Sequence, residues 1–123
     1  MSNPNFVLLY VDSPKASGDF YRALLGREPV EASPTFSMFA LESGLMLGLW
    51  SRHTVRPPAA AGAGGGELAF AAAGREEVDA AHARWRGLGV SILLEPTDLW
   101  FGRSFVGLDP DGHRLRVFAP AEG

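Results

Sequence analysis

The chain has 123 residues, a formal net charge of −3 at pH 7 and no cysteine. No cluster of lysine and arginine indicates nucleic-acid binding or a membrane anchor, and no run of about 18 apolar residues could span a bilayer. Without cysteine, disulfides, thiolate catalysis and thiolate zinc sites are excluded. The first residues lack the features of a signal peptide, so we expect a single cytoplasmic domain over residues 1–123, with neither nucleic acid nor a membrane as a partner.

The first module, residues 5–51, begins with a strand and a helix. Residues 5–11 are apolar and rich in strand-forming types. Ser13 can cap the helix that follows, and the proline after it suits the first helical turn, where its missing N–H would have no partner anyway. Apolar residues then recur every three to four positions, and Gly26 can take the left-handed conformation that ends a helix. We expect a helix over residues 14–25.

A hairpin follows, with strands at residues 35–41 and 45–50 around a glycine turn. Alternation along the second strand places Met46, Gly48 and Trp50 on one face and three leucines on the other. We expect the leucines to lie under the helix, with Met46 and Trp50 on a concave face and room at Gly48 for a flat ligand. The alternative is that a neighbouring core side chain fills the room at Gly48.

Residues 52–66 contain two adjacent prolines and several alanines and glycines. They predict a linker that lets two half-domains pair within one chain or between two chains. The second module, residues 67–119, repeats the order of strand, helix and glycine. Its expected elements are a strand at 67–73, a helix with its apolar pattern at 78–88, a short strand at 92–94, an irregular aromatic loop at 95–103, and strands at 104–108 and 114–118 around an Asp-Pro-Asp-Gly turn.

The two modules resemble one another in sequence. Gly26 matches Gly89 at the ends of the two predicted helices, and Gly44 matches Gly112 in the two predicted turns. Two similar half-domains that pair their sheets form a curved wall around a cleft, which is a usual place for a ligand.

Three segments carry a resemblance to a known family: Phe20–Tyr21, Leu24–Gly26 at the end of the first helix, and Asp109–His113 before the last strand. Over about residues 5–119 the chain resembles the glyoxalase / bleomycin resistance / extradiol dioxygenase superfamily, which has the vicinal oxygen chelate fold. The resemblance implies an α+β fold in which two βαβββ modules form a half-open mixed β-barrel. It also implies a homodimer, in which the linker would permit modules to be swapped.

Metal enzymes of this superfamily hold a divalent ion inside the barrel with His and Glu side chains, which leave positions open for substrate. The resemblance places the four ligand positions at Asn5, near Gly48, at Glu67 and at Arg116. Arginine stays protonated and repels a metal ion. We therefore expect no metal, no cofactor and no metal-dependent activity.

The three histidines are too far apart in sequence to form a metal-binding pair. We expect His82 to pack on the apolar side of the second helix and His113 to lie in the last turn. His53, just past Trp50, is the histidine we expect to contact a ligand.

Without a metal, the predicted site is an aromatic-lined cleft for a planar aromatic small molecule. Arg116 is expected either to receive a carboxylate or phenolate of that molecule or to pair with Glu67. The predicted ligand-binding residues are Trp50, Trp100, Met46, Phe39, Arg116 and His53, with Phe101 as a further candidate.

Residues 34–41, 46–51 and 109–120 are most similar to the phenazine-antibiotic resistance proteins of this superfamily. That resemblance implies a homodimer that protects the cell by holding a planar aromatic antibiotic, with no catalytic residue. The alternative is a glyoxalase-like or dioxygenase-like enzyme, a metal-dependent lyase or oxygenase of unknown substrate. Two further possibilities are a metal-free enzyme with Glu67 as its general base and a regulatory module, for which the sequence has no positive feature.

Overall fold

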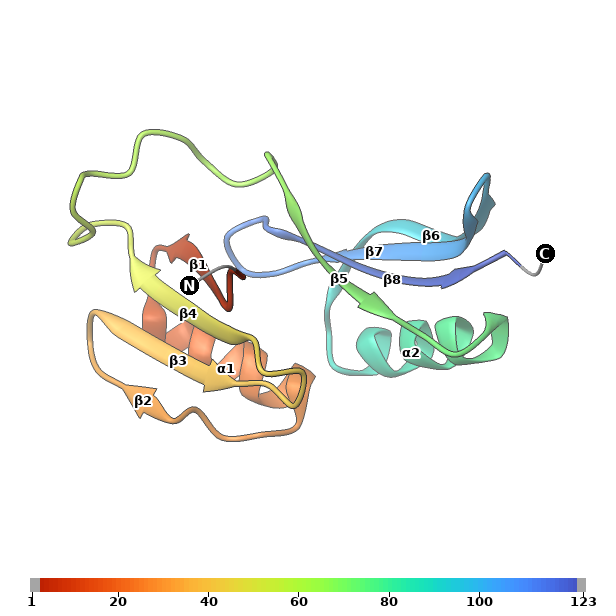
Figure 1. Cartoon of the computed structure of the whole chain (residues 1–123), viewed down its shortest axis with the longest axis horizontal. Coiled ribbons are helices and arrows are strands. Elements are labelled where there is room, and N and C mark those ends of the chain that lie inside the picture. The colour runs from red at the N-terminus through yellow and green to blue at the C-terminus, as the bar shows by residue number, and fades with distance from the viewer. Residues whose placement is uncertain (1–2, 122–123) are drawn as a thin grey trace. The chain divides into compact units, whose positions relative to one another are not determined.

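The computed structural model describes residues 3–121. The chain divides into two compact units, unit 1 over residues 1–62 and unit 2 over residues 63–123. The described part of each unit contains one helix and one four-stranded sheet, in the order βαβββ (Figure 1). The α+β class and the two βαβββ modules predicted from the sequence are confirmed.

Unit 1 is a sheet with one face covered by a helix. Its strand order is β1-β4-β3-β2, with β1 parallel to β4 and the other neighbours antiparallel. In Figure 1, α1 lies behind β3 and β4. The two-residue β2 is not among the elements predicted from the residue pattern. The elements are β1 (Phe6–Val11), α1 (Pro14–Leu25), β2 (Glu31–Ala32), β3 (Phe36–Ala40) and β4 (Met46–Ser51).

The helix α1 has the limits that the sequence predicts. The Ser13 hydroxyl oxygen accepts a hydrogen bond from the Ala16 N–H at 3.1 Å, so one of the unpaired N–H groups of the first turn is satisfied. Gly26 has a φ of 67°, and its N–H donates to the Arg22 carbonyl at 2.9 Å. This left-handed glycine ends the helix, and the prediction of a helix over residues 14–25 is confirmed.

The core of unit 1 lies between α1 and the sheet. Phe39 is opposite Leu47 in the β3–β4 register, and both are buried, together with Leu49. The helix contributes the fully buried Tyr21 to the same layer. The predicted burial of the β4 leucines is confirmed for Leu47 and Leu49, whereas Leu45 precedes β4 and is only half-buried.

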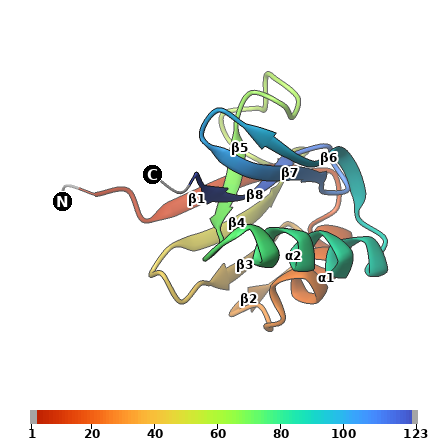
Figure 2. The ribbon, with the colours of Figure 1, turned by 90° about the vertical axis from the view of Figure 1, so that its right-hand side faces the viewer.

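Unit 2 repeats this plan with the strand order β5-β8-β7-β6. Figure 2 shows α2 along one face of this sheet. Trp85 of α2 makes edge-to-face contacts with Phe70 at 5.6 Å and Phe105 at 5.0 Å between ring centroids, which adds to the burial of these rings. The elements are β5 (Glu67–Ala71), α2 (Arg75–Gly87), β6 (Ser91–Leu99), β7 (Gly102–Leu108) and β8 (Arg114–Pro120).

The strand β6 corrects the sequence prediction. We expected a short strand at residues 92–94 and an irregular loop at 95–103, but β6 continues to Leu99. Its pairing with β7 is irregular between Leu94 and Thr97. Pro96 lies in that interval, where the ladder does not require an N–H donor. The proline therefore marks a break in register and not the end of the strand.

The sequence repeat has a counterpart in the backbone. Gly26 and Gly89 have φ values of 67° and 84°, and Gly44 and Gly112 have φ values of 93° and 87°. The matched glycines therefore serve the same purpose in both units, at the helix end and in the last hairpin. The half-open barrel, the homodimer and the swapping of modules stay predictions. Within residues 3–121, neither helix is long and apolar enough to cross a membrane.

A substitution at Gly102, the first residue of β7, tests the backbone conformation of unit 2. Its φ is 142°, and a Cβ at this position would overlap the carbonyl oxygen of Ala119 on β8. We expect Gly102→Ala to lower the free energy of unfolding by about 3 kcal/mol, because both the φ value and the space exclude a methyl group. Urea unfolding followed by circular dichroism measures this change.

Gly65→Ala is the matched control, since a Cβ at Gly65 meets nothing within 4 Å. It should leave the free energy of unfolding within about 0.5 kcal/mol of the wild-type value. Equal midpoints for Gly102→Ala and Gly65→Ala would contradict the conformation described for the β6–β7 hairpin.

Candidate functional site

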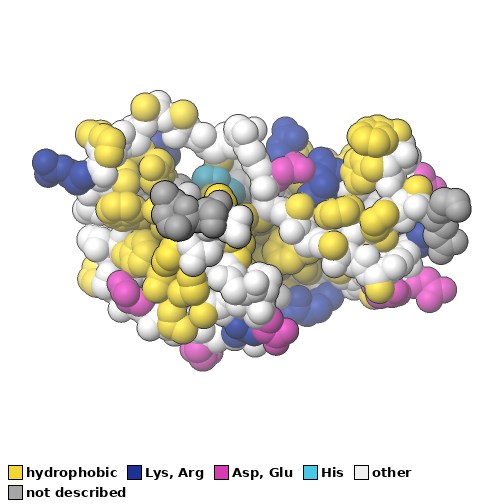
Figure 3. All heavy atoms as spheres, in the orientation of Figure 1, with side chains coloured by type: hydrophobic (Ala, Val, Ile, Leu, Met, Phe, Trp, Pro, Cys, Tyr) yellow, Lys and Arg dark blue, Asp and Glu magenta, His cyan; other side chains and the backbone are white. Residues whose placement is uncertain are grey.

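The face of the unit 1 sheet opposite α1 carries an apolar array, which we call the aromatic face. Its members are set by the register of three neighbouring strands, and none is charged. Phe6, Leu8 and Tyr10 of β1 remain 51%, 43% and 40% exposed. In Figure 3, hydrophobic side chains gather over the part of unit 1 where β3 and β4 face the viewer. The aromatic face consists of Phe6, Leu8 and Tyr10 on β1, Met46, Gly48 and Trp50 on β4, and Phe36, Met38 and Ala40 on β3.

Trp50 lies at one end of this array, between two aromatic neighbours. The register pairs it with Tyr10 on β1 and with Phe36 on β3. The Phe36 ring meets the indole edge to face, with centroids 6.1 Å apart. Trp50 is half-buried, and Met46 lies on the same face. The row of three rings crosses β1, β4 and β3 and offers a flat ligand aromatic contacts.

Gly48 does not leave the empty space that the sequence suggested. A Cβ at Gly48 would lie 2.6 Å from a methyl carbon of Leu8 and 3.0 Å from the Phe36 ring. Neighbouring side chains fill this space, which is the alternative given with the prediction. The glycine brings Leu8 and Phe36 close to the backbone of β4, so the aromatic face has no slot at this position.

Phe39 was assigned to the wrong face. It pairs with Leu47, and it is 0% exposed in the core beneath α1. Strand side chains alternate, so a residue opposite Leu47 cannot share a face with Trp50. Phe36 and Met38 are the β3 residues of the aromatic face. The alternation of side chains, counted from Trp50 across the neighbouring strands, identifies Phe36 and Met38 and also the β1 residues of the aromatic face.

Trp100 lies at the tip of the β6–β7 hairpin and is 94% exposed. Its indole contacts the Phe101 ring at 5.4 Å, and Phe101 in turn lies 6.1 Å from Phe118. The indole is therefore not a wall of a cleft within unit 2, and a ligand contact by Trp100 stays a prediction.

Arg116 lies on the face of the unit 2 sheet opposite α2. Its Nε donates to Glu67 Oε1 at 2.6 Å, and its Nη2 donates to Glu67 Oε2 at 3.3 Å. Its Nη1 donates to the Ser104 hydroxyl at 2.9 Å. The Arg116 side chain is 19% exposed and that of Glu67 31%. Of the two expectations for Arg116, the pair with Glu67 is the one the structure shows.

The histidines lie in three different settings. His53 Nε2 lies 2.7 Å from the Asp12 carboxylate at the unit 1 surface, and its contact with a ligand stays a prediction. His82 is 15% exposed and packs against the Phe105 ring at 5.3 Å, as expected of a packing residue. The backbone N–H of His113 donates to the Asp109 carboxylate at 2.9 Å within the last turn.

A hollow in unit 1, of about 650 Å³, lies on the side of α1. None of its lining residues is aromatic. Its walls combine prolines with charged side chains, so it offers a flat ring no aromatic contact. The start of α1 contributes Pro14, Lys15, Gly18 and Asp19 to its lining, together with the N-cap residue Ser13.

The superfamily profile described as Glyoxalase/Bleomycin resistance protein/Dioxygenase superfamily matches residues 3–117. The chain belongs to this superfamily. Over 117 residues it is 32% identical to the phenazine antibiotic resistance protein EhpR of Enterobacter agglomerans, an alignment that covers 93% of this chain and 89% of that protein.

Two solved structures have a similar fold. A protein from Agrobacterium tumefaciens, determined by solution NMR, is 54% identical with a TM-score of 0.90, covering 99% of this chain and all of that one. A crystal structure of a glyoxalase/bleomycin resistance protein/dioxygenase from Nocardioides is 29% identical with a TM-score of 0.83, covering 100% of this chain and 87% of that one.

The positions that the resemblance assigns to the metal of glyoxalase-superfamily enzymes do not suit a divalent ion in this chain. Both carboxylate oxygens of Glu67 are engaged by Arg116, and Gly48 has no side chain to offer. Among residues 3–121, no group of three or more His, Asp or Glu side chains is placed to hold a metal ion. The residues present therefore do not fit the catalytic metal of this superfamily.

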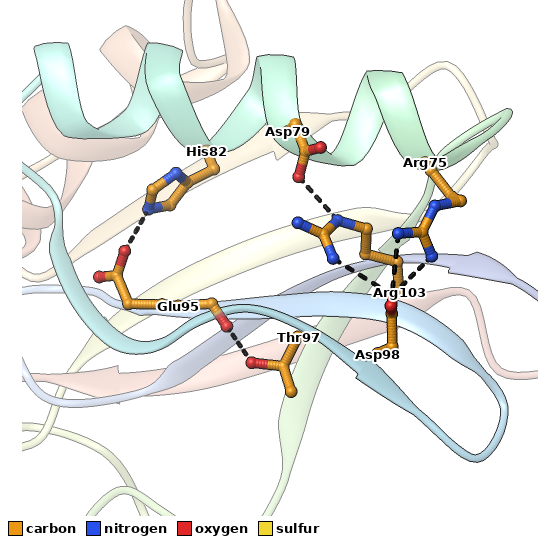
Figure 4. Close-up of polar contacts among 7 residues, drawn as sticks. All are labelled: Arg75, Asp79, His82, Glu95, Thr97, Asp98 and Arg103. Atoms are coloured by element: carbon orange, nitrogen blue, oxygen red, sulfur yellow. Dashed lines mark hydrogen bonds and ion pairs between the residues drawn. The ribbon is translucent and has the colours of Figure 1, made fainter.

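An ion-pair network fixes the base of the hairpin that carries Trp100 (Figure 4). Asp98 accepts hydrogen bonds from Arg75 of α2 at 2.6 Å and from Arg103 of β7 at 3.2 Å. Arg103 also donates to Asp79 of α2 at 2.8 Å. Hydrogen bonds from Arg75, which has the larger effect, and from Arg103 hold the pKa of the Asp98 carboxyl below its ordinary value. The network therefore ties both strands of the hairpin to α2.

We expect Asp98→Asn to lower the melting temperature at pH 7, because Arg75 and Arg103 lose their shared anion. The Asp98 pKa is lower in the folded than in the unfolded chain, so its stabilisation is present above the ordinary value of 3.8 and is lost as pH falls through the folded pKa. The difference in melting temperature between wild type and variant should shrink toward zero as the pH falls below 3.8 and the Asp98 carboxyl becomes protonated in the folded chain.

Glu31→Gln, which removes the same charge from an exposed residue of unit 1, is the control and should show little difference at either pH. A difference for Asp98→Asn that is equally large at pH 7 and at low pH would show that the Asp98 charge does not stabilise the hairpin.

Proposed function

We propose that the protein binds a planar aromatic antibiotic, of the phenazine type, and protects the cell by holding it without chemical change. The observation that carries the proposal is the uncharged aromatic face of unit 1, with Tyr10, Trp50 and Phe36 in one row across three strands. The 32% identity to a phenazine antibiotic resistance protein supports this class of ligand. We further propose that the protein acts as a cytoplasmic homodimer.

The aromatic face has enough apolar area for useful affinity. A tricyclic ring that covers roughly 300 Å² of apolar surface gains about 7 kcal/mol from burial. Each well-oriented ring contact adds about 0.5–1.5 kcal/mol, and the cost of immobilising the ligand offsets part of the sum. A dissociation constant in the micromolar range, which corresponds to a binding free energy of about −8 kcal/mol, is therefore within reach without any polar contact.

The same observations support binding over catalysis. The three strands of the aromatic face carry no carboxylate, imidazole or cation that could transfer a proton to a ring lying on it, and the carboxylate that borders the face is that of Glu31 on β2, opposite Met38. On unit 2, the Glu67 carboxylate is held by Arg116 through both oxygens. A metal-dependent lyase or oxygenase has less support, because the residues at the superfamily's metal positions do not suit a divalent ion.

We expect Trp50→Ala to weaken the binding of phenazine at least tenfold, because the variant loses the central ring of the aromatic row. A tenfold loss corresponds to about 1.4 kcal/mol. Isothermal titration calorimetry measures the affinity without relying on tryptophan fluorescence. Trp50→Phe should recover part of the loss, because it keeps an aromatic ring at this position.

Leu93→Ala is the control, since Leu93 is a 49% exposed apolar residue of unit 2. It should bind phenazine as the wild type does. If Trp50→Ala folds, as judged by circular dichroism, and binds with the affinity of the wild type, the aromatic face is not the binding surface.

A further inference from the structure

The Glu31 side chain lies at the β2 edge of the aromatic face. The antiparallel register places Glu31 opposite Met38, and Met38 is opposite Gly48 on β4. Residues directly opposite one another in an antiparallel pair share a face, so Glu31 leaves the sheet on the same side as Met38. The next residue, Ala32, pairs with the buried Ser37, and both line the hollow on the side of α1, as strand alternation requires.

The charge of Glu31 has no partner in the described part of the chain. Glu31 is exposed, and none of the ion pairs among residues 3–121 includes it. At the end of β3, by contrast, Arg27 donates to the Ala40 carbonyl and to Glu42, the latter at 3.3 Å, so that cation is matched. Four further charged residues of unit 1 line the hollow on the side of α1, namely Lys15, Asp19, Arg22 and Glu28.

The remaining charged residues of unit 1 lie beyond the ends of β1 and β4. Arg52 and Arg56 follow the last residue of β4. The Asp12 carboxylate, just past the end of β1, lies 2.7 Å from Nε2 of His53. Both arginines are outside the strands, so no strand register places them on the aromatic face. Glu31 is placed there by its pairing with β3.

A ring that rests on β3 and β4 comes close enough to Glu31 to feel its charge. Neighbouring strands lie about 4.8 Å apart, so the edge of such a ring is roughly 5–8 Å from the Glu31 carboxylate. At this separation in water, a charge on the ring changes the affinity about threefold, and salt screens the effect. The faces of Tyr10, Trp50 and Phe36 also attract a cation. A planar cation is therefore favoured by the carboxylate and by the rings, and an anion is disfavoured by both.

We propose that Glu31 sets the charge specificity of the aromatic face, which binds a planar aromatic cation, such as an N-alkylated phenazinium ring, in preference to a neutral or anionic ring of the same size. This inference rests on the proposed function, since it concerns the ligand of the same face. It lies wholly within unit 1, whose strand register fixes both the rings and the carboxylate.

The test compares N-methylphenazinium, phenazine and phenazine-1-carboxylate, which share one ring system and are a cation, a neutral molecule and an anion at neutral pH. Calorimetric titration at low salt should show that the wild type binds the cation about tenfold more tightly than the anion, with phenazine between them. Glu31→Gln should weaken binding of the cation about threefold, strengthen binding of the anion about threefold and leave that of phenazine unchanged. In the wild type, about 0.5 M sodium chloride should reduce the preference.

Glu28→Gln is the matched control, since it removes the same charge from the side of the sheet that α1 covers, where the Glu28 side chain is 78% exposed. It should keep the preference of the wild type, and Arg52→Gln should not reduce it. If phenazine binds but the cation binds no more tightly than the anion, or if Glu31→Gln and Glu28→Gln change the preference equally, this inference is wrong while the proposed function stands. If none of the three compounds binds the wild type, the proposed function fails as well.

Discussion

In unit 1, the central strand β4 is parallel to β1 and antiparallel to β3, and both pairings have a single unbroken register. Strand side chains alternate, so this register decides which residues lie under α1 and which stay accessible. It buries Phe39 and Leu47 and leaves Tyr10 and Trp50 together on the other face. A shift of one residue would reverse the two sets. The aromatic face therefore follows from the same pairing that builds the core.

Unit 2 has the same βαβββ plan but a different chemistry on the face opposite its helix. Where β1, β4 and β3 of unit 1 carry no charged side chain on this face, unit 2 carries Arg116, held by Glu67 and Ser104. In metal enzymes of the superfamily, the resemblance implies that the corresponding positions bind a divalent ion. In this chain one of these positions holds a guanidinium, and its carboxylate partner neutralises it.

The sequence predicts what depends on local rules. The helix at residues 14–25, the glycines at the turns and the βαβββ order follow from caps, periodicity and backbone preference, and the resemblance supplied the family. Features that depend on pairing between strands were harder to predict. Phe39 was placed on the wrong face, and the filled space at Gly48 depends on Leu8, which is distant in sequence. The exposure of Trp100 depends on β6 continuing past Pro96, which local propensity does not favour.

Amide chemical shifts recorded by NMR while phenazine is added test the central claim most directly, because they report which strands the compound touches. We expect the largest changes along β1 and β4, from Phe6 to Tyr10 and from Met46 to Trp50. Saturation at micromolar concentrations and an unchanged phenazine spectrum after release would agree with sequestration. Changes confined to α1 and its hollow, or none at all, would contradict the assignment of the aromatic face as the binding surface.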